Sequence, residues 1–224
     1  MLGLVLLAAI VIVAAIYLLP LAYRSQRRKR KNQERQRLAA ARGWRFAASD
    51  PDLLRRWRGD PFDRPGDFRK VLGVVHGEVG GRAFTAFDYQ RRAVVTTRGG
   101  GSYDVVTVWA LPLPAALQPL RVVPAGALAR RTGGSGTIAT GDAEFDRRFK
   151  VEASDAGFAR ALLTPELTAW LREAGLGPWR TEGAWLLHTR DAVRRTTPRA
   201  LVATAEQLAA LVVRFPAGVW QASP

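Results

Sequence analysis

The chain has 224 residues, of which 34 are Lys or Arg and 19 are Asp or Glu, and its formal net charge is +15 at pH 7. It contains no cysteine, so a disulfide framework, a cysteine-based zinc site and a thiol nucleophile are excluded. Hydrophobic residues make up 48% of the sequence and seven residues are Trp, which excludes a disordered chain.

The first 23 residues carry no charged side chain. Their length matches the roughly 20 residues that cross about 30 Å of hydrocarbon, so the sequence predicts a transmembrane helix over residues 1–23. A cleaved signal peptide is the alternative, but its basic residues would precede a shorter apolar core, whereas here they follow it. Because basic residues beside a span stay in the cytoplasm, we expect a single-pass inner (plasma) membrane protein. Its N-terminus would lie outside and its C-terminal domain would be cytoplasmic.

Residues 24–37 contain eight basic side chains and one acidic one. The run has three interpretations: it fixes topology and contacts anionic lipids, it is a solvated spacer, or it binds nucleic acid. The run has no aromatic residue to stack on bases, so we do not expect nucleic acid as a partner. We predict a basic juxtamembrane helical stem over residues 24–42. The side chains expected to fix topology and contact the lipid bilayer are Arg24, Arg27, Arg28, Lys29, Arg30 and Lys31.

A cytoplasmic domain is predicted over residues 43–224, beginning with a short extended segment at WRF, a brief helix at LLRRW and turn-rich GDPFDRPGDF. VLGVVHGEV and RAFTAFDYQRRAVVTT favour a hairpin about Gly80 and Gly81, and YDVVTVWAL favours another strand of an antiparallel sheet. PLPAALQP breaks the strand pattern, and LRVV resumes it. A subdivision of this domain is therefore placed near residues 112–120 or 150.

The C-terminal third is predicted to contain helices and a hairpin. Asp155 caps a first helix, and Thr164 followed by Pro165 begins a second that ends at Gly175. PWRTEGAWLLHT indicates two strands about a turn, and TPRALVATAEQLAALVVRF indicates an amphipathic helix packed on the sheet. The predicted fold class is α+β: an N-terminal transmembrane helix, then a soluble domain with an antiparallel sheet and packed helices.

No catalytic, cofactor-binding or metal-ligating residue is assigned, and no cofactor is expected. Asp60, Asp63 and Asp67 lack the spacing of a calcium loop and are interpreted as turn residues. His76 and His188 lie in predicted strands without a second ligand nearby. The glycine-rich ARRTGGSGTIATGD lacks the lysine of a phosphate-binding loop.

The segment GDAEFDRRFKVEASD is interpreted as a strand with Phe145 and Phe149 on one face. It fits two accounts. The first is an edge strand with a surface ion pair between Asp146 and Arg148. The second is a basic, aromatic-flanked surface for an acidic partner. The residues of that candidate interaction surface are Asp146, Arg147, Arg148 and Lys150.

FDRRFKV, followed by the Asp155 helix and LLTPELTAWL, resembles a family of uncharacterised bacterial membrane-anchored proteins. RGWRF and GDPF upstream are similar in kind, so the resemblance covers most of the chain after the stem. It implies a membrane anchor with a cytoplasmic domain, and it supplies no activity, cofactor or catalytic residue.

The function predicted from the sequence is a membrane-tethered interaction or scaffold domain that binds a protein partner. One alternative is a hydrolase at the membrane surface whose residues converge from distant strands. A second alternative is nucleic-acid binding at the membrane, suggested by the net positive charge of the residues after the stem.

Overall fold

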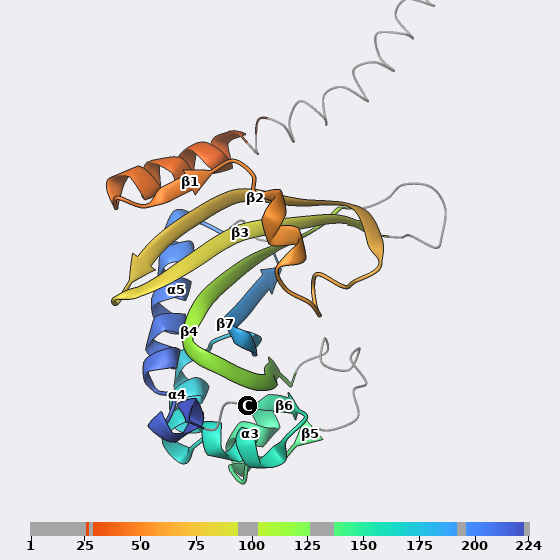
Figure 1. Cartoon of the computed structure of the whole chain (residues 1–224), viewed down its shortest axis with the longest axis vertical. Helices are drawn as coiled ribbons and strands as arrows, with labels where there is room; N and C mark the ends of the chain where they lie inside the picture. Colours follow the sequence, from red (N-terminus) through yellow and green to blue (C-terminus); the bar gives the residue numbers. More distant parts are fainter. Residues whose placement is uncertain (1–25, 27–28, 94–102, 126–136, 192–195, 222–224) are drawn as a thin grey trace, which may run out of the picture.

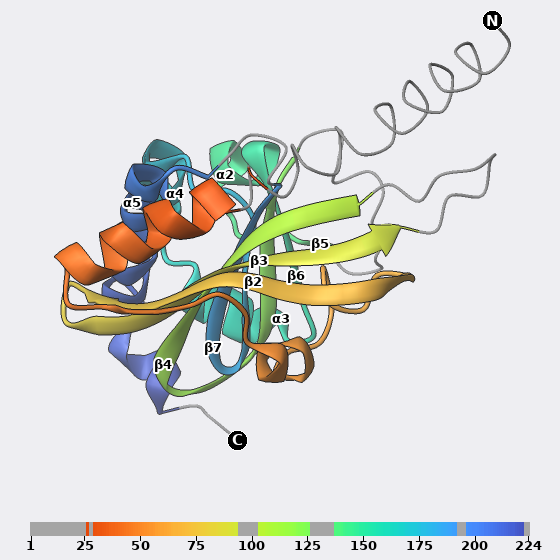
Figure 2. The ribbon, with the colours of Figure 1, turned by 90° about the horizontal axis from the view of Figure 1, so that it is seen from above.

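The strands form one seven-stranded sheet in the computed structural model, which describes residues 26, 29–93, 103–125, 137–191 and 196–221 (Figures 1 and 2). All pairings are antiparallel. The order is β1-β2-β3-β4-β6-β5, and β7 pairs with β4. The strands are β1 (Arg45–Ala47), β2 (Gly66–Val79), β3 (Arg82–Ala93), β4 (Tyr103–Pro124), β5 (Thr137–Ile138), β6 (Phe149–Ala153) and β7 (Trp179–Asp191).

The hairpin predicted about the glycine pair is confirmed. Val79 pairs with Arg82, and the two residues between them are Gly80 and Gly81, with φ of 55° and 70°. Two consecutive positive φ angles are typical of the turn whose twist matches that of the flanking strands, and glycine adopts them without a steric penalty.

β4 is one continuous strand that bends, and it includes the segment PLPAALQP, where the sequence predicted a break (Figure 1). β7 pairs with β4 on both sides of this segment. The pairing of β4 with β7 shifts register between Pro112 and Leu117 and again before Leu120. A proline has no amide to donate to the ladder, so the sheet accommodates this segment as an irregularity rather than a strand end. β7 is likewise one strand, with a positive φ of 54° at Gly183, which corrects the two predicted strands.

Helices cover one face of the sheet (Figure 1). α5 contacts β2, β3 and β4, and the Trp109 indole of β4 donates to the Leu201 carbonyl oxygen of α5 at 3.0 Å. The predicted caps Asp155 and Thr164 are in place, and Gly175 ends the second helix with φ 58°. The labelled helices are α2 (Ala143–Arg148), α3 (Ala156–Leu162), α4 (Pro165–Ala174), α5 (Pro198–Val213) and the 3₁₀ turns η1 (Pro51–Arg55) and η3 (Ala217–Trp220), and a further helix occupies residues 29–41.

The opposite face of the sheet carries a second apolar cluster. Trp57 and Phe62, from the chain after η1, cover Phe87 of β3 and Leu187 of β7. The Trp57 and Phe87 rings are stacked with centroids 5.8 Å apart. The turn-rich loop that joins η1 to β2 is thereby held against the strands.

A helix at residues 29–41 also packs on the sheet (Figure 2). Ala39 lies in the main core, and Arg35 is 1% exposed. The Arg35 guanidinium donates to the Gly73 carbonyl oxygen at 2.5 Å and to Asp88 Oδ1 at 2.8 Å. Part of the basic run predicted as a stem is therefore built into the fold.

The predicted fold class and localisation need correction. The structure is mostly an antiparallel sheet with several helices, so it is α+β only in part. None of the helices in the described ranges is long and apolar enough to cross a membrane. This finding does not support the single-pass inner-membrane localisation. Residues 1–23, on which the span was predicted, lie outside the described residues.

Candidate functional site

Three charged side chains form a row across β6, β4 and β7. Arg121 pairs in register with Glu152 on one side and with Arg180 on the other. Directly opposed residues in an antiparallel sheet project from the same face, so these groups lie side by side. Arg121 Nη1 is 3.2 Å from Glu152 Oε2.

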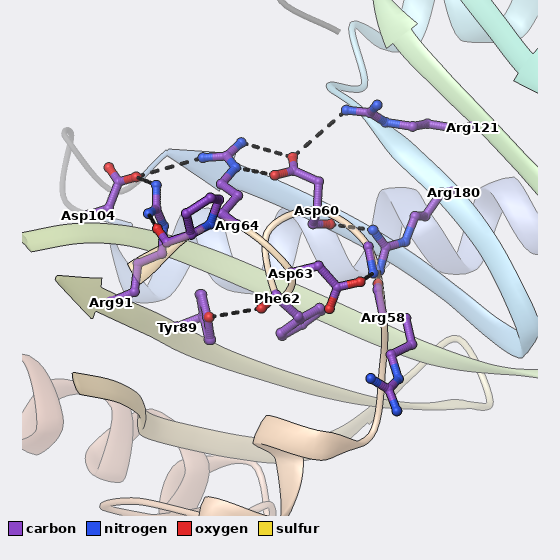
Figure 3. A network of polar contacts seen from close by, with 12 residues as sticks. Arg58, Asp60, Phe62, Asp63, Arg64, Tyr89, Arg91, Asp104, Arg121 and Arg180 are labelled. Carbon is purple, nitrogen blue, oxygen red and sulfur yellow. Dashed lines mark hydrogen bonds and ion pairs between the residues drawn. The ribbon is translucent and has the colours of Figure 1, made fainter. Parts of the chain in front are cut away.

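The loop after η1 closes over the Arg180 end of this row (Figure 3). The Arg180 guanidinium donates to the carbonyl oxygens of Arg58 and Asp60 and, at 2.8 Å, to Glu182 Oε2. The other oxygen of Glu182 accepts from the Arg58 amide at 2.7 Å. One arginine therefore fixes the backbone of a loop about 120 residues away in sequence.

Asp60 joins the row to a second set of ion pairs (Figure 3). Its carboxylate pairs with Arg64 and lies 3.8 Å from Arg121 Nη2. Arg64 in turn approaches Asp104, which pairs with Arg91 at 2.6 Å. We call this set the arginine–carboxylate network. Its members are Asp60, Arg64, Arg91, Asp104, Arg121, Glu152, Arg180 and Glu182.

A shallow pocket of about 370 Å³ lies beside the row. Burial lowers the pKa of Arg180, against the opposing charge of Glu182, and its buried Nε has no hydrogen-bond partner. The arrangement presents paired guanidinium groups and the Ser154 side chain to a polar ligand or to a partner surface, whereas the Thr181 hydroxyl is buried and donates to the Gln118 carbonyl oxygen. Glu152 accepts from Arg121 rather than from a hydroxyl, so it is not placed as the base of a nucleophile. The lining residues are Pro119, Leu120, Arg121, Glu152, Ala153, Ser154, Arg180 and Thr181.

The six basic residues predicted to contact lipid do not share one environment. Lys29 and Arg30 are exposed on the 29–41 helix, and Lys31 Nζ lies 2.5 Å from Asp88 Oδ2. Lys31 is therefore held against the sheet. The remaining three, Arg24, Arg27 and Arg28, lie outside the described residues.

The segment predicted as one strand from residue 141 begins as the helix α2. Asp142 starts this helix by accepting the amides of Glu144 and Phe145 at 3.1 and 3.0 Å. The Phe145 amide holds the pKa of Asp142 below its usual range. Only after Arg148 does the chain enter β6, and the Phe145 and Phe149 rings stack 4.8 Å apart.

The four residues of the predicted interaction surface are therefore divided between two elements. Asp146 accepts from the Thr140 hydroxyl at 2.8 Å, and Arg148 pairs with Glu144, so the expected Asp146–Arg148 ion pair is wrong. Arg147 is exposed on α2. Lys150 lies on β6 two residues before Glu152, on the same face as the charged row.

The aspartates of the turn-rich loop and the two histidines form contacts other than metal ligation. Asp63 accepts from the Gly59 amide at 2.6 Å, as expected of a turn residue, and Asp67 binds Arg92. His76 Nδ1 is 3.0 Å from the Thr85 hydroxyl oxygen, and His188 lies in the core. Within the described ranges, no three His, Asp or Glu side chains are grouped to hold a metal ion.

Sequence reasoning missed Arg121, Glu152 and Arg180. They come from three strands, and only the register places them together. The sequence around Asp60 does indicate a turn, because Asp60 is one of three aspartates that lie with two prolines in GDPFDRPGDF. That signal indicated a turn but not the arginines that the turn meets.

No protein-family model matches the sequence, and a search of curated proteins gives no match. One solved structure is similar in fold: the crystal structure of the mycobacterial trehalose monomycolate transport factor A, TtfA. The TM-score is 0.58 at 17% sequence identity, and the match covers 83% of this chain and 96% of that chain. At this identity the similarity shows a shared fold.

Proposed function

We propose that the chain is an accessory or scaffold domain that holds a protein or lipid partner in a transport assembly. The single observation that carries the proposal is the fold shared with TtfA, which is described as a transport factor, over nearly the whole of that chain. The resemblance to a family of bacterial proteins, carried by the FDRRFKV region, remains part of this proposal. It adds no activity.

The α2–β6 corner is the proposed contact for a protein partner. The arginine–carboxylate network supports this choice because its charges are already paired with each other and fix the shape of the adjoining surface. Arg147 and Lys150, in contrast, form no ion pair within the described residues. Such cations at a rim favour encounter with an acidic partner.

Crosslinked affinity capture from cells tests this proposal. The full chain should recover a specific partner, and the double charge reversal R147E/K150E should reduce its recovery about tenfold, equivalent to roughly 1.4 kcal/mol. R199E reverses an exposed charge on α5 and serves as the matched control. Recovery that is equal in all three chains, or the repeated absence of any specific partner, would contradict the proposal.

A further inference from the structure

Two exposed aromatic side chains lie at the end of the sheet where β2 and β4 begin and β3 ends. Arg92 pairs in register with Asp67 of β2 and with Tyr103 of β4, so the three side chains form a row. The Arg92 guanidinium carbon is 4.2 Å from the ring centroid of Phe68. Phe68 is 54% exposed and Tyr103 is 48% exposed; among the described residues, only Val213 is another large exposed hydrophobic residue.

The backbone of Phe68 is strained. Its φ is 48°, the only positive value at a non-glycine residue in the described ranges. A bulky side chain rarely adopts this left-handed region, and Phe gains no local hydrogen bond there as Asn or Asp would. The register between β2 and β3 shifts between Asp67 and Lys70, so the strained residue lies in an irregular part of the pairing. Burial of the Phe68 ring therefore does not compensate for the strain in its backbone, because the ring is exposed.

The surroundings of the two rings are basic. The acidic residues next to them in sequence are paired, Asp67 with Arg92 and Asp104 with Arg91. Arg69 donates to a backbone carbonyl oxygen, and Lys70 forms no ion pair within the described residues. Exposed aromatic rings next to cations without a carboxylate partner match the boundary between charged headgroups and apolar chains in a lipid surface.

We propose that this end of the sheet, at the right in Figures 1 and 2, docks onto an anionic lipid surface. Phe68 and Tyr103 enter the headgroup layer, and Arg69 and Lys70 contact its phosphates. This inference rests on the proposed function, specifically on its proposal of a lipid partner. It uses a different surface from the α2–β6 corner, so either surface can fail its test while the other passes.

The absence of cysteine allows a single label to report on this surface alone. The full chain carrying Q90C, at the position opposite Lys70 in the pairing of β2 with β3, is labelled with an environment-sensitive fluorophore and mixed with vesicles of phosphatidylglycerol and phosphatidylcholine. We expect a blue shift of the emission that salt weakens and that phosphatidylcholine vesicles alone do not produce. The same label at V213C, another exposed position, should not shift. Binding through another part of the chain would not distinguish the two labelled positions, so the comparison between them identifies the docking surface.

F68G separates docking from folding. Glycine accepts a positive φ without strain, so the unfolding midpoint should stay equal or rise. Loss of the ring should raise the lipid concentration needed for a half-maximal shift about tenfold. V213A is the control and should leave that concentration unchanged. The proposal is overturned if position 90 shows no shift, if V213C shifts equally, if F68G keeps its affinity, or if F68G destabilises the fold.

Discussion

At the scale of single residues, His188 is the most constrained titratable group. It is 1% exposed, and its Nδ1 lies 2.8 Å from the Pro178 carbonyl oxygen. A carbonyl oxygen can only accept, so Nδ1 carries the proton and Nε2 does not. Nε2 is buried without a partner. Burial lowers the pKa of His188 to about 4, because a second proton would place an unpaired charge in the core.

This depressed pKa predicts a loss of stability in mild acid. Between pH 6.5 and pH 4 the unfolded state binds a proton at His188 and the folded state does not, so the free energy of unfolding falls as pH falls. The total loss is about 3 kcal/mol once the pH is below 4. Urea denaturation at a series of pH values should show this decline in the parent chain and a flatter profile in H188N, whose amide can still donate to Pro178. Parallel profiles would contradict the assignment.

At the scale of elements, the 29–41 helix is held by a buried ion pair. Burial alone would raise the pKa of Asp88, but the charges of Arg35 and Lys31 outweigh it and hold the pKa below its ordinary value. The Thr107 hydroxyl also donates to Asp88, at 2.9 Å. These contacts join a basic helix to the middle of the sheet, on the face that α5 also covers.

Removing one partner of this pair should be costly. R35M leaves Asp88 with only one cation and takes a donor from the Gly73 carbonyl oxygen, so we expect a loss of about 3 kcal/mol in the free energy of unfolding. R37M removes an exposed charge from the same helix and should change it by less than about 0.5 kcal/mol. Urea titration measures both, and hydrogen exchange over residues 29–41 should rise only in R35M. Equal effects of the two variants would exclude a specific role for Arg35.

The same elements show how far sequence can predict this fold. The Gly80–Gly81 hairpin and the α5 stripe follow from local patterns, and both are present. The basic run looks uniform in sequence, and nothing local distinguishes buried Arg35 from exposed Arg37, because Asp88 lies 53 residues away. The alternation in FDRRFKV favours a strand, although Asp142, three residues before Phe145, is a local signal for a helix start. Arg121, Glu152 and Arg180 could not be grouped without the strand register.

At the scale of the whole molecule, one apolar core passes through both parts of the bent sheet. It includes Val75 and Phe84 near the hairpin as well as Phe145 and Leu171 in the C-terminal third. β4 pairs with β3 in its first half and with β6 in its second, and it is continuous between them. A continuous strand and a shared core favour unfolding as one cooperative unit. Whether the predicted subdivision near residues 112–120 or 150 exists therefore depends on whether the two parts unfold together or independently.

F145A tests that question. The Phe145 ring is fully buried in the C-terminal third, so its loss should cost about 3–5 kcal/mol. If the molecule unfolds as one unit, slow hydrogen exchange of the β2–β3 amides, which lie in the other part of the sheet, should accelerate by the same free energy. F84A, which removes a buried ring of the same core near the hairpin, is the reciprocal variant and should accelerate exchange in α4. Protection of β2–β3 that is unchanged in F145A would show two independently stable parts, because each half of β4 would then hold its neighbours without the other.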